Sequence, residues 1–192
     1  MSGRFVTLEG PEGAGKSTLA AALAKRLPNV LLTREPGDGP VGRKIREALL
    51  HGDELDSWTE VFLFLADRRQ HVEGVIRPAL DQGKTVICDR YADSTVVYQG
   101  HGRDLPVDLL RKLNRLATSG LTPDLTILLD LPAEAGLSRL ADKDRMDREP
   151  LSFHERVREG FLMEAKRDPD RWRVLDASLP ADELADRAAG LI

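Results

Sequence analysis

The sequence is poor in cysteine: Cys88 is the only one among 192 residues. A single thiol excludes a disulfide framework within the chain and the multi-cysteine ligand sets of structural zinc sites. Because Cys88 stands in an apolar run, we expect it to be a small core residue. Histidine is also sparse, and no two histidines have metal-ligand spacing; they are His51, His71, His101 and His154.

Long hydrophobic runs and charged tails are missing too. The longest apolar run, Val61–Ala66, is far short of the roughly 20 residues that span a bilayer. The first predicted strand begins at about Arg4, which leaves no room for a signal peptide. With 28 basic and 32 acidic residues the net charge is −4, which argues against a general nucleic-acid binder. We therefore expect a soluble cytoplasmic protein that contacts neither membranes nor nucleic acids.

What the sequence does contain is an alternation of strand-like and helix-like segments. Strand-like runs cover residues 4–9, 29–33, 84–89, 124–131 and 173–176. Helical segments cover residues 17–27, 41–50, 57–81, 106–119, 132 onward, 153–166 and 182–192. Apolar strands separated by helices indicate a parallel sheet covered on both faces. We predict an α/β, P-loop NTPase-like three-layer fold, with one domain over residues 1–192 and a five-stranded parallel sheet between helices.

The longest predicted helix carries signals at both ends. Ser57, followed three residues later by Glu60, fits a capping box at its start. Pro78 near its end indicates a kink or a boundary. Gly83 ends the helical segment.

Residues 10–17 match the phosphate-binding pattern G-x-x-x-x-G-K-[ST], between a predicted strand and a predicted helix. Its glycines let backbone N–H groups approach phosphates, and the helix N-terminus adds a positive dipole end. Lys16 would reach the terminal phosphates and Ser17 would bind Mg²⁺. A glycine-rich turn could match by chance, but the flanking elements favour a nucleoside triphosphate site. The predicted ATP-binding residues here are Gly10, Pro11, Glu12, Gly13, Ala14, Gly15, Lys16, Ser17 and Thr18.

The third strand ends in Asp89 and Arg90. Ligands of open α/β sheets bind outside the carboxyl ends of the strands, so this pair should face the phosphate loop. Asp89 could hold Mg²⁺ through water, and the planar fork of Arg90 could clamp a second phosphate. The alternative is a structural ion pair at a strand end.

A charged segment at residues 141–150 could close over the nucleotide as a mobile lid. None of the variable loop positions 11–14 is basic, so arginines from elsewhere must meet the charge of a transferring phosphoryl group. Arg139, Arg145 and Arg148 are the candidates, although a merely solvated loop has the same composition. A phosphate acceptor, with a second pKa of about 6, would need no general base. A hydroxyl acceptor would need a carboxylate base.

Six motifs resemble those of the bacterial thymidylate kinase (dTMP kinase) family, over nearly the whole chain. The most specific is Asp89–Gly100 (DRYADSTVVYQG). The others are Glu9–Ser17 (EGPEGAGKS), Thr33–Gly37 (TREPG), Phe64–Arg68 (FLADR), Pro123–Thr126 (PDLT) and Phe153–Arg158 (FHERVR). The resemblance implies transfer of the γ-phosphoryl group of Mg·ATP to dTMP, with Mg²⁺ held by Ser17 and Asp89.

The resemblance also implies which residues recognise the base. Phe64 matches the aromatic residue that stacks on thymine, and Arg68, four residues on and on the same helix face, matches the arginine that bonds the base edge. Thr95 and Gln99 match positions near the base. Tyr98 matches the ring beneath the sugar that crowds out a 2′-hydroxyl. Without the motifs, Phe64 would be assigned to the core by its apolar character.

Around the acceptor phosphate the resemblance implies a second set of residues. Glu12 corresponds to an acidic residue near the sugar hydroxyl and phosphate, Arg34 and Pro36 border the acceptor, and Arg90 contacts its phosphate. Arg145 corresponds to a lid arginine that supplies charge in the transition state. Arg139 and Arg148 are also expected at the ATP phosphates. The residues near the adenine are expected around positions 176–179.

The resemblance implies a homodimer with residues 57–81 at or near the interface. The sequence departs from the usual R-E-P-G-G-T pattern at Asp38 and Gly39, and Arg148 stands where a glutamine is common. Two rival functions share parts of the pattern. A deoxynucleoside kinase would phosphorylate thymidine, and a nucleotide-dependent switch would need an N-K-x-D element, which is missing from the sequence.

Overall fold

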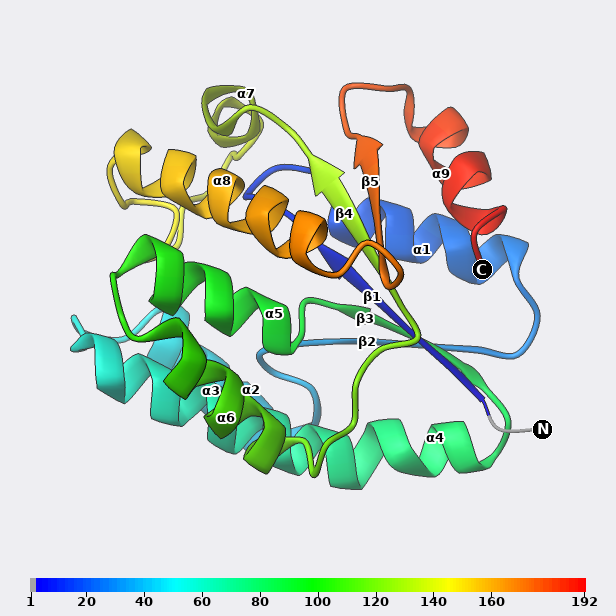
Figure 1. Cartoon of the computed structure of the whole chain (residues 1–192), viewed down its shortest axis with the longest axis horizontal. Helices are drawn as coiled ribbons and strands as arrows, with labels where there is room; N and C mark the ends of the chain where they lie inside the picture. The colour runs from blue at the N-terminus through cyan, green and yellow to red at the C-terminus, as the bar shows by residue number, and fades with distance from the viewer. Residues whose placement is uncertain (1–2) are drawn as a thin grey trace.

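Five parallel strands form one sheet in the computed structural model, which describes residues 3–192. The strand order is β2-β3-β1-β4-β5, so the strand that leads into the phosphate loop lies in the centre (Figure 1). Each neighbouring pair is parallel, for example Leu8 of β1 beside Asp89 of β3 and Ile127 of β4. The strands are β1 (Arg4–Glu9), β2 (Val30–Arg34), β3 (Thr85–Asp89), β4 (Leu125–Asp130) and β5 (Trp172–Asp176).

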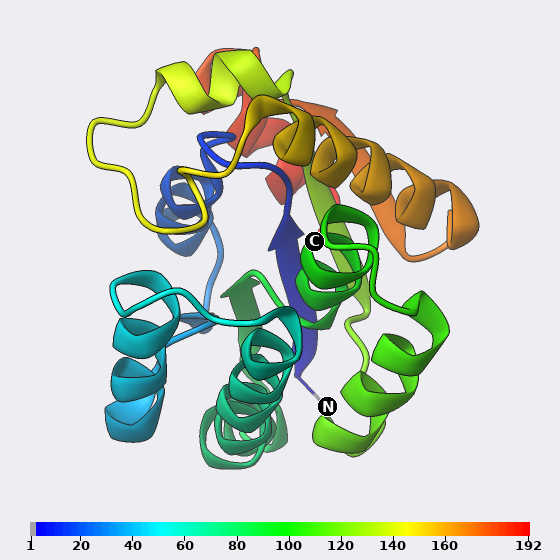
Figure 2. The same cartoon turned by 90° about the vertical axis from the view of Figure 1, so that its left-hand side faces the viewer.

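Helices connect these strands and cover both faces of the sheet (Figures 1 and 2). They are α1 (Lys16–Arg26), α2 (Gly39–Leu50), α3 (Ser57–His71), η1 (Val72–Ile76), α4 (Arg77–Asp81), α5 (Ala92–Thr95), η2 (Val96–Gly102), α6 (Val107–Ala117), α7 (Ala133–Ser138), α8 (Leu151–Arg167) and α9 (Ala181–Ala189). The predicted fold class is confirmed.

One face of the sheet packs against α1 and α9. Buried side chains from β1 and β4, such as Leu8 and Ile127, contact Leu19 and Leu23 of α1 and Leu184 of α9 in one apolar cluster. Because α1 begins directly after the phosphate loop, this cluster fixes the helix N-terminus at the carboxyl end of β1.

The opposite face is covered by α3, η1, α4, η2 and α8. Phe5 of β1 packs among η1 side chains and against the ring of Tyr91 at a centroid distance of 4.9 Å. Further along the sheet, Phe161 of α8 packs against Tyr98 of η2 at 6.0 Å. Tyr98 therefore comes from a segment that packs against α8.

The predicted helix 57–81 is one helical segment with two local differences. Its N-cap is Asp56, whose carboxylate accepts hydrogen bonds from the backbone N–H groups of Trp58 and Thr59, so the predicted cap at Ser57 is wrong. Ser57 is already helical. The five residues of η1 form a π-helical turn, after which Pro78 lies in the first turn of α4, where its missing N–H is tolerated.

The helical segment Ala92–Gly102 was not predicted as a separate element. It is largely buried although it carries polar residues such as Thr95 and Gln99, so it lacks the amphipathic period that reveals a surface helix.

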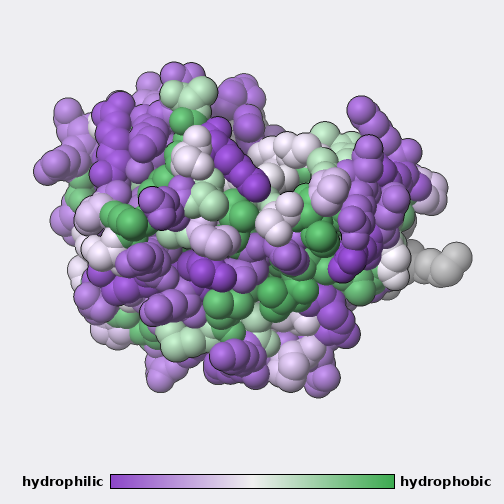
Figure 3. All heavy atoms as spheres, turned by 90° about the horizontal axis from the view of Figure 1, so that it is seen from above, coloured by the Kyte–Doolittle hydropathy of each residue, from purple (hydrophilic) through white to green (hydrophobic). Residues whose placement is uncertain are grey.

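Within residues 3–192, no helix combines the length and the apolar character needed to cross a membrane. The face shown in Figure 3 is largely hydrophilic, with apolar side chains gathered towards its middle.

Candidate active site

A cavity of about 610 Å³ follows the edge of the sheet where the strands end. It reaches from Arg34 at the end of β2, past Asp89 at the end of β3 and the phosphate loop after β1, to Ala177 after β5. Four separate connections therefore contribute to one site, as expected at the carboxyl edge of an open parallel sheet. The predicted residues that line it are Glu12, Gly13, Ala14, Gly15, Lys16, Ser17, Thr18, Arg34, Pro36, Phe64, Arg68, Asp89, Arg90, Thr95, Tyr98, Gln99 and Arg139.

The glycines of the phosphate loop are required by its conformation. Gly10, Gly13 and Gly15 all have positive φ angles, of 142°, 68° and 90°. A Cβ atom on Gly10 would collide with the carbonyl of Leu129, and one on Gly13 with the carbonyl of Gly136. Without side chains at these positions, the loop lies against β4 and α7 and leaves its backbone N–H groups available to an anion.

Lys16 is held inside this loop. Its Nζ donates to the carbonyls of Gly10 at 2.9 Å and Pro11 at 2.7 Å, and the side chain is buried. Burial and the nearby Arg90 cation lower the pKa of Lys16 to about 8. Gly10 and Pro11 therefore act through their carbonyls and do not line the cavity.

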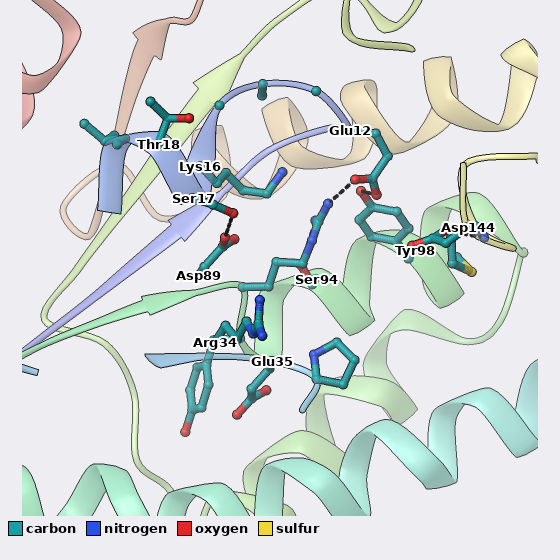
Figure 4. A pocket seen from close by; sticks show the side chains of 18 of the residues that line it. Glu12, Lys16, Ser17, Thr18, Arg34, Glu35, Asp89, Ser94, Tyr98 and Asp144 are labelled. Carbon is teal, nitrogen blue, oxygen red and sulfur yellow. Dashed lines mark hydrogen bonds and ion pairs between the residues drawn. The ribbon is translucent and has the colours of Figure 1, made fainter. Parts of the chain in front are cut away.

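Ser17 and Asp89 meet across the carboxyl ends of β1 and β3. The Ser17 hydroxyl donates to Asp89 Oδ2 at 2.6 Å (Figure 4). Residues 3–192 contain no cluster of three or more His, Cys, Asp or Glu side chains that could hold a metal. Two oxygen ligands nevertheless fit Mg²⁺, which usually takes one or two protein oxygens and completes its shell with water and phosphate oxygens.

Glu12, Arg90 and Tyr98 line the cavity as one connected group; Glu12 and Tyr98 are labelled in Figure 4. Arg90 donates to Glu12 at 2.7 Å, and the Tyr98 hydroxyl donates to the other Glu12 oxygen at 2.6 Å. The Arg90 guanidinium also lies 4.9 Å from the centre of the Tyr98 ring. Burial would raise the pKa of Glu12, but the cations Arg90 and Lys16 outweigh it and hold the pKa at about 2.

Glu9 supports this group through hydrogen bonds to the turn that follows Arg90, a role that the sequence did not predict. Its carboxylate accepts hydrogen bonds from the backbone N–H groups of Tyr91 and Ser94, at 2.9 and 3.3 Å, and from the Ser94 hydroxyl at 2.6 Å. Burial, with the Asp93 charge, raises the pKa of Glu9 to about 7. Arg90, which has a positive φ of 68°, is thus held in its unusual backbone conformation by Glu9 bonds to the turn that follows it.

The predicted base-binding residues lie together between α3 and the segment α5–η2. Phe64 is partly buried at the cavity wall, beside Thr95 and Gln99. Arg68 is 1% exposed, and its guanidinium donates to Glu35, Thr95, Asn114 and the carbonyl of Tyr91 at 2.6–3.0 Å. These bonds use four of the five N–H donors of a guanidinium, so one donor is left for a ligand.

Sequence reasoning missed Arg46 of α2, which also lines the cavity. It donates to the carbonyl of Pro36 at 2.8 Å, and burial together with Arg34 lowers its pKa. Its position four residues before the end of an amphipathic helix gave no sign that it faces the site.

Asp38 also has a defined role. It caps α2 by accepting from the N–H of Gly39 at 2.8 Å, and Thr33 donates its hydroxyl to the same carboxylate. The departure from the family pattern therefore supplies a helix cap.

The three arginines near the predicted lid are placed differently. Arg139 reaches across the phosphate loop, donating to the carbonyls of Gly13 and Ala177 at 3.4 and 3.5 Å. Arg145 and Arg148 do not line the main cavity and instead line a second one, of about 580 Å³, on the other side of the lid. The predicted phosphate contacts of Arg145 and Arg148 stay predictions. Leu140, Asp144 and Met146 are the residues near the lid that face the main cavity.

The pKa of Lys16 generates a test of the phosphate loop. Because the free side chain loses its charge as the pH rises through about 8, affinity for ATP should fall about tenfold per pH unit above that value, until the pKa of the bound state is reached. Calorimetric titration with ATP from pH 7 to 9.5 measures this. Lys16→Met should bind weakly with a flat profile. A flat profile in the unaltered protein would contradict the role of Lys16.

Comparison with known proteins agrees with this site. The family model described as thymidylate kinase matches residues 8–188. The thymidylate kinase of Thermomicrobium roseum is 54% identical over 190 residues, covering 95% of this chain and 90% of the relative. That of Deinococcus radiodurans is 50% identical over 190 residues, covering 95% and 92%. The crystal structure of thymidylate kinase from Ehrlichia chaffeensis superimposes with a TM-score of 0.84 at 33% identity, covering 100% of this chain and 98% of that one. This chain therefore belongs to the thymidylate kinase family.

Proposed function

We propose that this protein transfers the γ-phosphoryl group of Mg·ATP to dTMP, giving dTDP and ADP. The observation that carries the proposal is one continuous cavity that contains both the phosphate loop and a base pocket beside Phe64. Arg90 contacts both parts, because it donates to the Gly10 carbonyl at 3.1 Å and lies against the Tyr98 ring. Two nucleotides placed end to end would bring their phosphates together at Arg90.

On the donor side, the chain supplies positioning and positive charge. The phosphate-loop N–H groups and the N-terminus of α1 would bind the β- and γ-phosphates, with Lys16 at the transferring group. Ala177 and Leu179, after β5, line the far end of the cavity and would contact the adenine. Ser17 and Asp89 would hold Mg²⁺, which when bound neutralises charge on the phosphates.

On the acceptor side, Phe64 would stack on thymine, and the remaining donor of Arg68 would bond the base edge. The Tyr98 ring, fixed by its bond to Glu12, would lie beneath the sugar and leave no space for a 2′-hydroxyl. Arg34, Arg46 and Arg90 would orient the acceptor phosphate.

The site also favours a phosphate over a hydroxyl as acceptor. A phosphate monoester is ionised at neutral pH and attacks without a base. Glu12 lines the cavity beside the phosphate loop, but its pKa of about 2 and its bonds to Arg90 and Tyr98 make it a poor proton acceptor. The arrangement therefore supports a monophosphate kinase over a deoxynucleoside kinase.

The direct test is a coupled ADP-release assay with dTMP, thymidine, dUMP and CMP as acceptors. We expect dTMP to be phosphorylated with the highest kcat/KM, because Phe64 offers a platform for the base and Glu12 is a poor proton acceptor. Faster turnover of thymidine would favour the deoxynucleoside kinase, and absence of acceptor-dependent ADP release would favour a nucleotide switch.

Phe64→Ala tests the base pocket. Stacking of a base on an aromatic ring contributes about 1–3 kcal/mol, so the KM for dTMP should rise roughly tenfold or more. The KM for ATP, measured in the same assays, should stay within about twofold and serves as the internal control. A change confined to ATP would place Phe64 on the wrong side of the cavity.

A homodimer through α3 is a further part of the proposal. Phe62 on this helix is 59% exposed, and its ring lies 6.2 Å from that of Trp58. Trp58 is partly buried, and an exposed aromatic ring packed beside a second one is typical of a protein–protein contact. Light scattering should give twice the chain mass for the unaltered protein and the chain mass for Phe62→Asp; a monomer in both cases would refute the interface.

The expected cytoplasmic location remains a prediction.

A further inference from the structure

Glu60 of α3 is fully buried, at 0% exposure, and lies outside both nucleotide pockets. Its carboxylate accepts four hydrogen bonds, two on each oxygen. Oε2 accepts from Arg103 at 2.8 Å and Gln99 at 3.2 Å, and Oε1 accepts from Arg103 at 2.8 Å and Arg145 at 2.6 Å. A buried carboxylate is retained at low free energy only with such complete pairing.

The donors to Glu60 come from two segments that the sequence keeps far apart. Gln99 and Arg103 lie in and directly after η2, whereas Arg145 belongs to the lid. Arg145 also ties the lid to the last turn of α2, because its Nε donates to the Leu49 carbonyl at 2.9 Å and its backbone N–H to the Leu50 carbonyl at 3.1 Å. Glu60 is therefore the point where α3, η2 and the lid meet.

A second bond fastens the far end of the lid to the same group. Arg103 Nη2 donates to Glu149 at 2.8 Å, and its guanidinium lies 5.3 Å from the centre of the Phe153 ring. Residues 145 and 149 are thus both attached, and Met146 between them is buried and faces the main cavity.

The attachment also reaches the base pocket. Gln99, which donates to Glu60, lines the main cavity, and Phe64 lies one helical turn after Glu60 on α3. A shift of Glu60 would therefore move the lid and the wall of the base pocket together.

We propose that Glu60 is a positioning residue that anchors the lid, through Arg145 and Arg103, to the wall of the base pocket. Arg145 then serves as the anchor of the lid, while Lys16, Arg90 and Mg²⁺ neutralise the charge of the transferring group. The kinetic consequence of this anchor rests on the proposed function; its effect on the lid does not.

The test begins with Glu60→Gln, which keeps the side-chain shape and removes the charge that pairs both arginines. Hydrogen exchange followed by mass spectrometry should show amides of residues 141–150 exchanging about tenfold faster, with α1 unchanged, because the lid opens more often. The kcat for dTMP phosphorylation should fall about tenfold or more, and the ratio of ATP hydrolysis to phosphoryl transfer should rise, because a displaced lid admits water. Glu47→Gln, an exposed carboxylate on α2, is the matched control and should change neither quantity.

Arg145→Gln and the double variant separate an anchor from a direct phosphate contact. If Arg145 acts through Glu60, both single variants show the same faster lid exchange and the same loss of kcat, and the double variant loses little more. Arg145→Lys, which keeps the charge, should restore part of the slow amide exchange of the lid and part of kcat. Normal lid exchange in Glu60→Gln, or additive losses in the double variant, would overturn the proposal.

Lid exchange in Arg145→Gln and the dTMP kinase activity of the unaltered protein distinguish the remaining outcomes. Should Glu60→Gln fail to fold, unchanged lid exchange in Arg145→Gln overturns the proposal by itself, and faster exchange supports it. If the unaltered protein lacks dTMP kinase activity while both variants loosen the lid, the proposed function fails and the anchor stands.

Discussion

The architecture of the site depends on neutralising buried charge at the carboxyl edge of the sheet. Lys16 and Arg90 lie within one group with Glu9, Glu12 and Asp89. Their mutual attraction offsets the cost of removing each charge from water, which would otherwise be several kcal/mol per ion. Because each charge needs its partners, the phosphate loop, the turn after β3 and the segment η2 have little freedom to move apart. The cations are therefore already in place before any phosphate arrives, which is the condition for electrostatic catalysis without reorganisation.

A second buried network holds the acceptor side in the same way. Glu35, which follows β2, accepts hydrogen bonds from Arg68 at 2.8 Å and pairs with His71 at 2.9 Å. Arg68 in turn reaches Thr95 and Asn114, so α3, α5 and α6 share one set of polar contacts. The proposed base pocket lies beside this network, and Phe64 projects from the same helix as Arg68. The wall of the proposed acceptor site is therefore held by buried polar contacts from three helices.

The lid shows how far sequence patterns extend. The charge of residues 141–150 could be predicted, since a charged run between helices stands out in composition, and their closure over a nucleotide stays a prediction. The partners of its arginines could not, because Glu60 lies 85 residues away in the chain and its burial is not visible in the sequence. Arg46 and Glu9 were missed for the same reason: each is an ordinary charged residue until the fold places it. The N-cap of α3 is Asp56, one residue before the predicted Ser57. Both side chains could accept hydrogen bonds from the free N–H groups of the first turn, and the sequence does not show which of them does.

The sequence by itself determined the alternation of strands and helices, the phosphate loop and the family, because these depend on local periodicity, on glycine conformation and on motifs of contiguous residues. The tertiary structure alone decided how the charges pair. In the folded chain Arg90 pairs with Glu12, Arg68 with Glu35, and Arg145 with Glu60. The physical reason is that an ion pair forms wherever two opposite charges lose water together, and which charges do so depends on packing between segments distant in the chain.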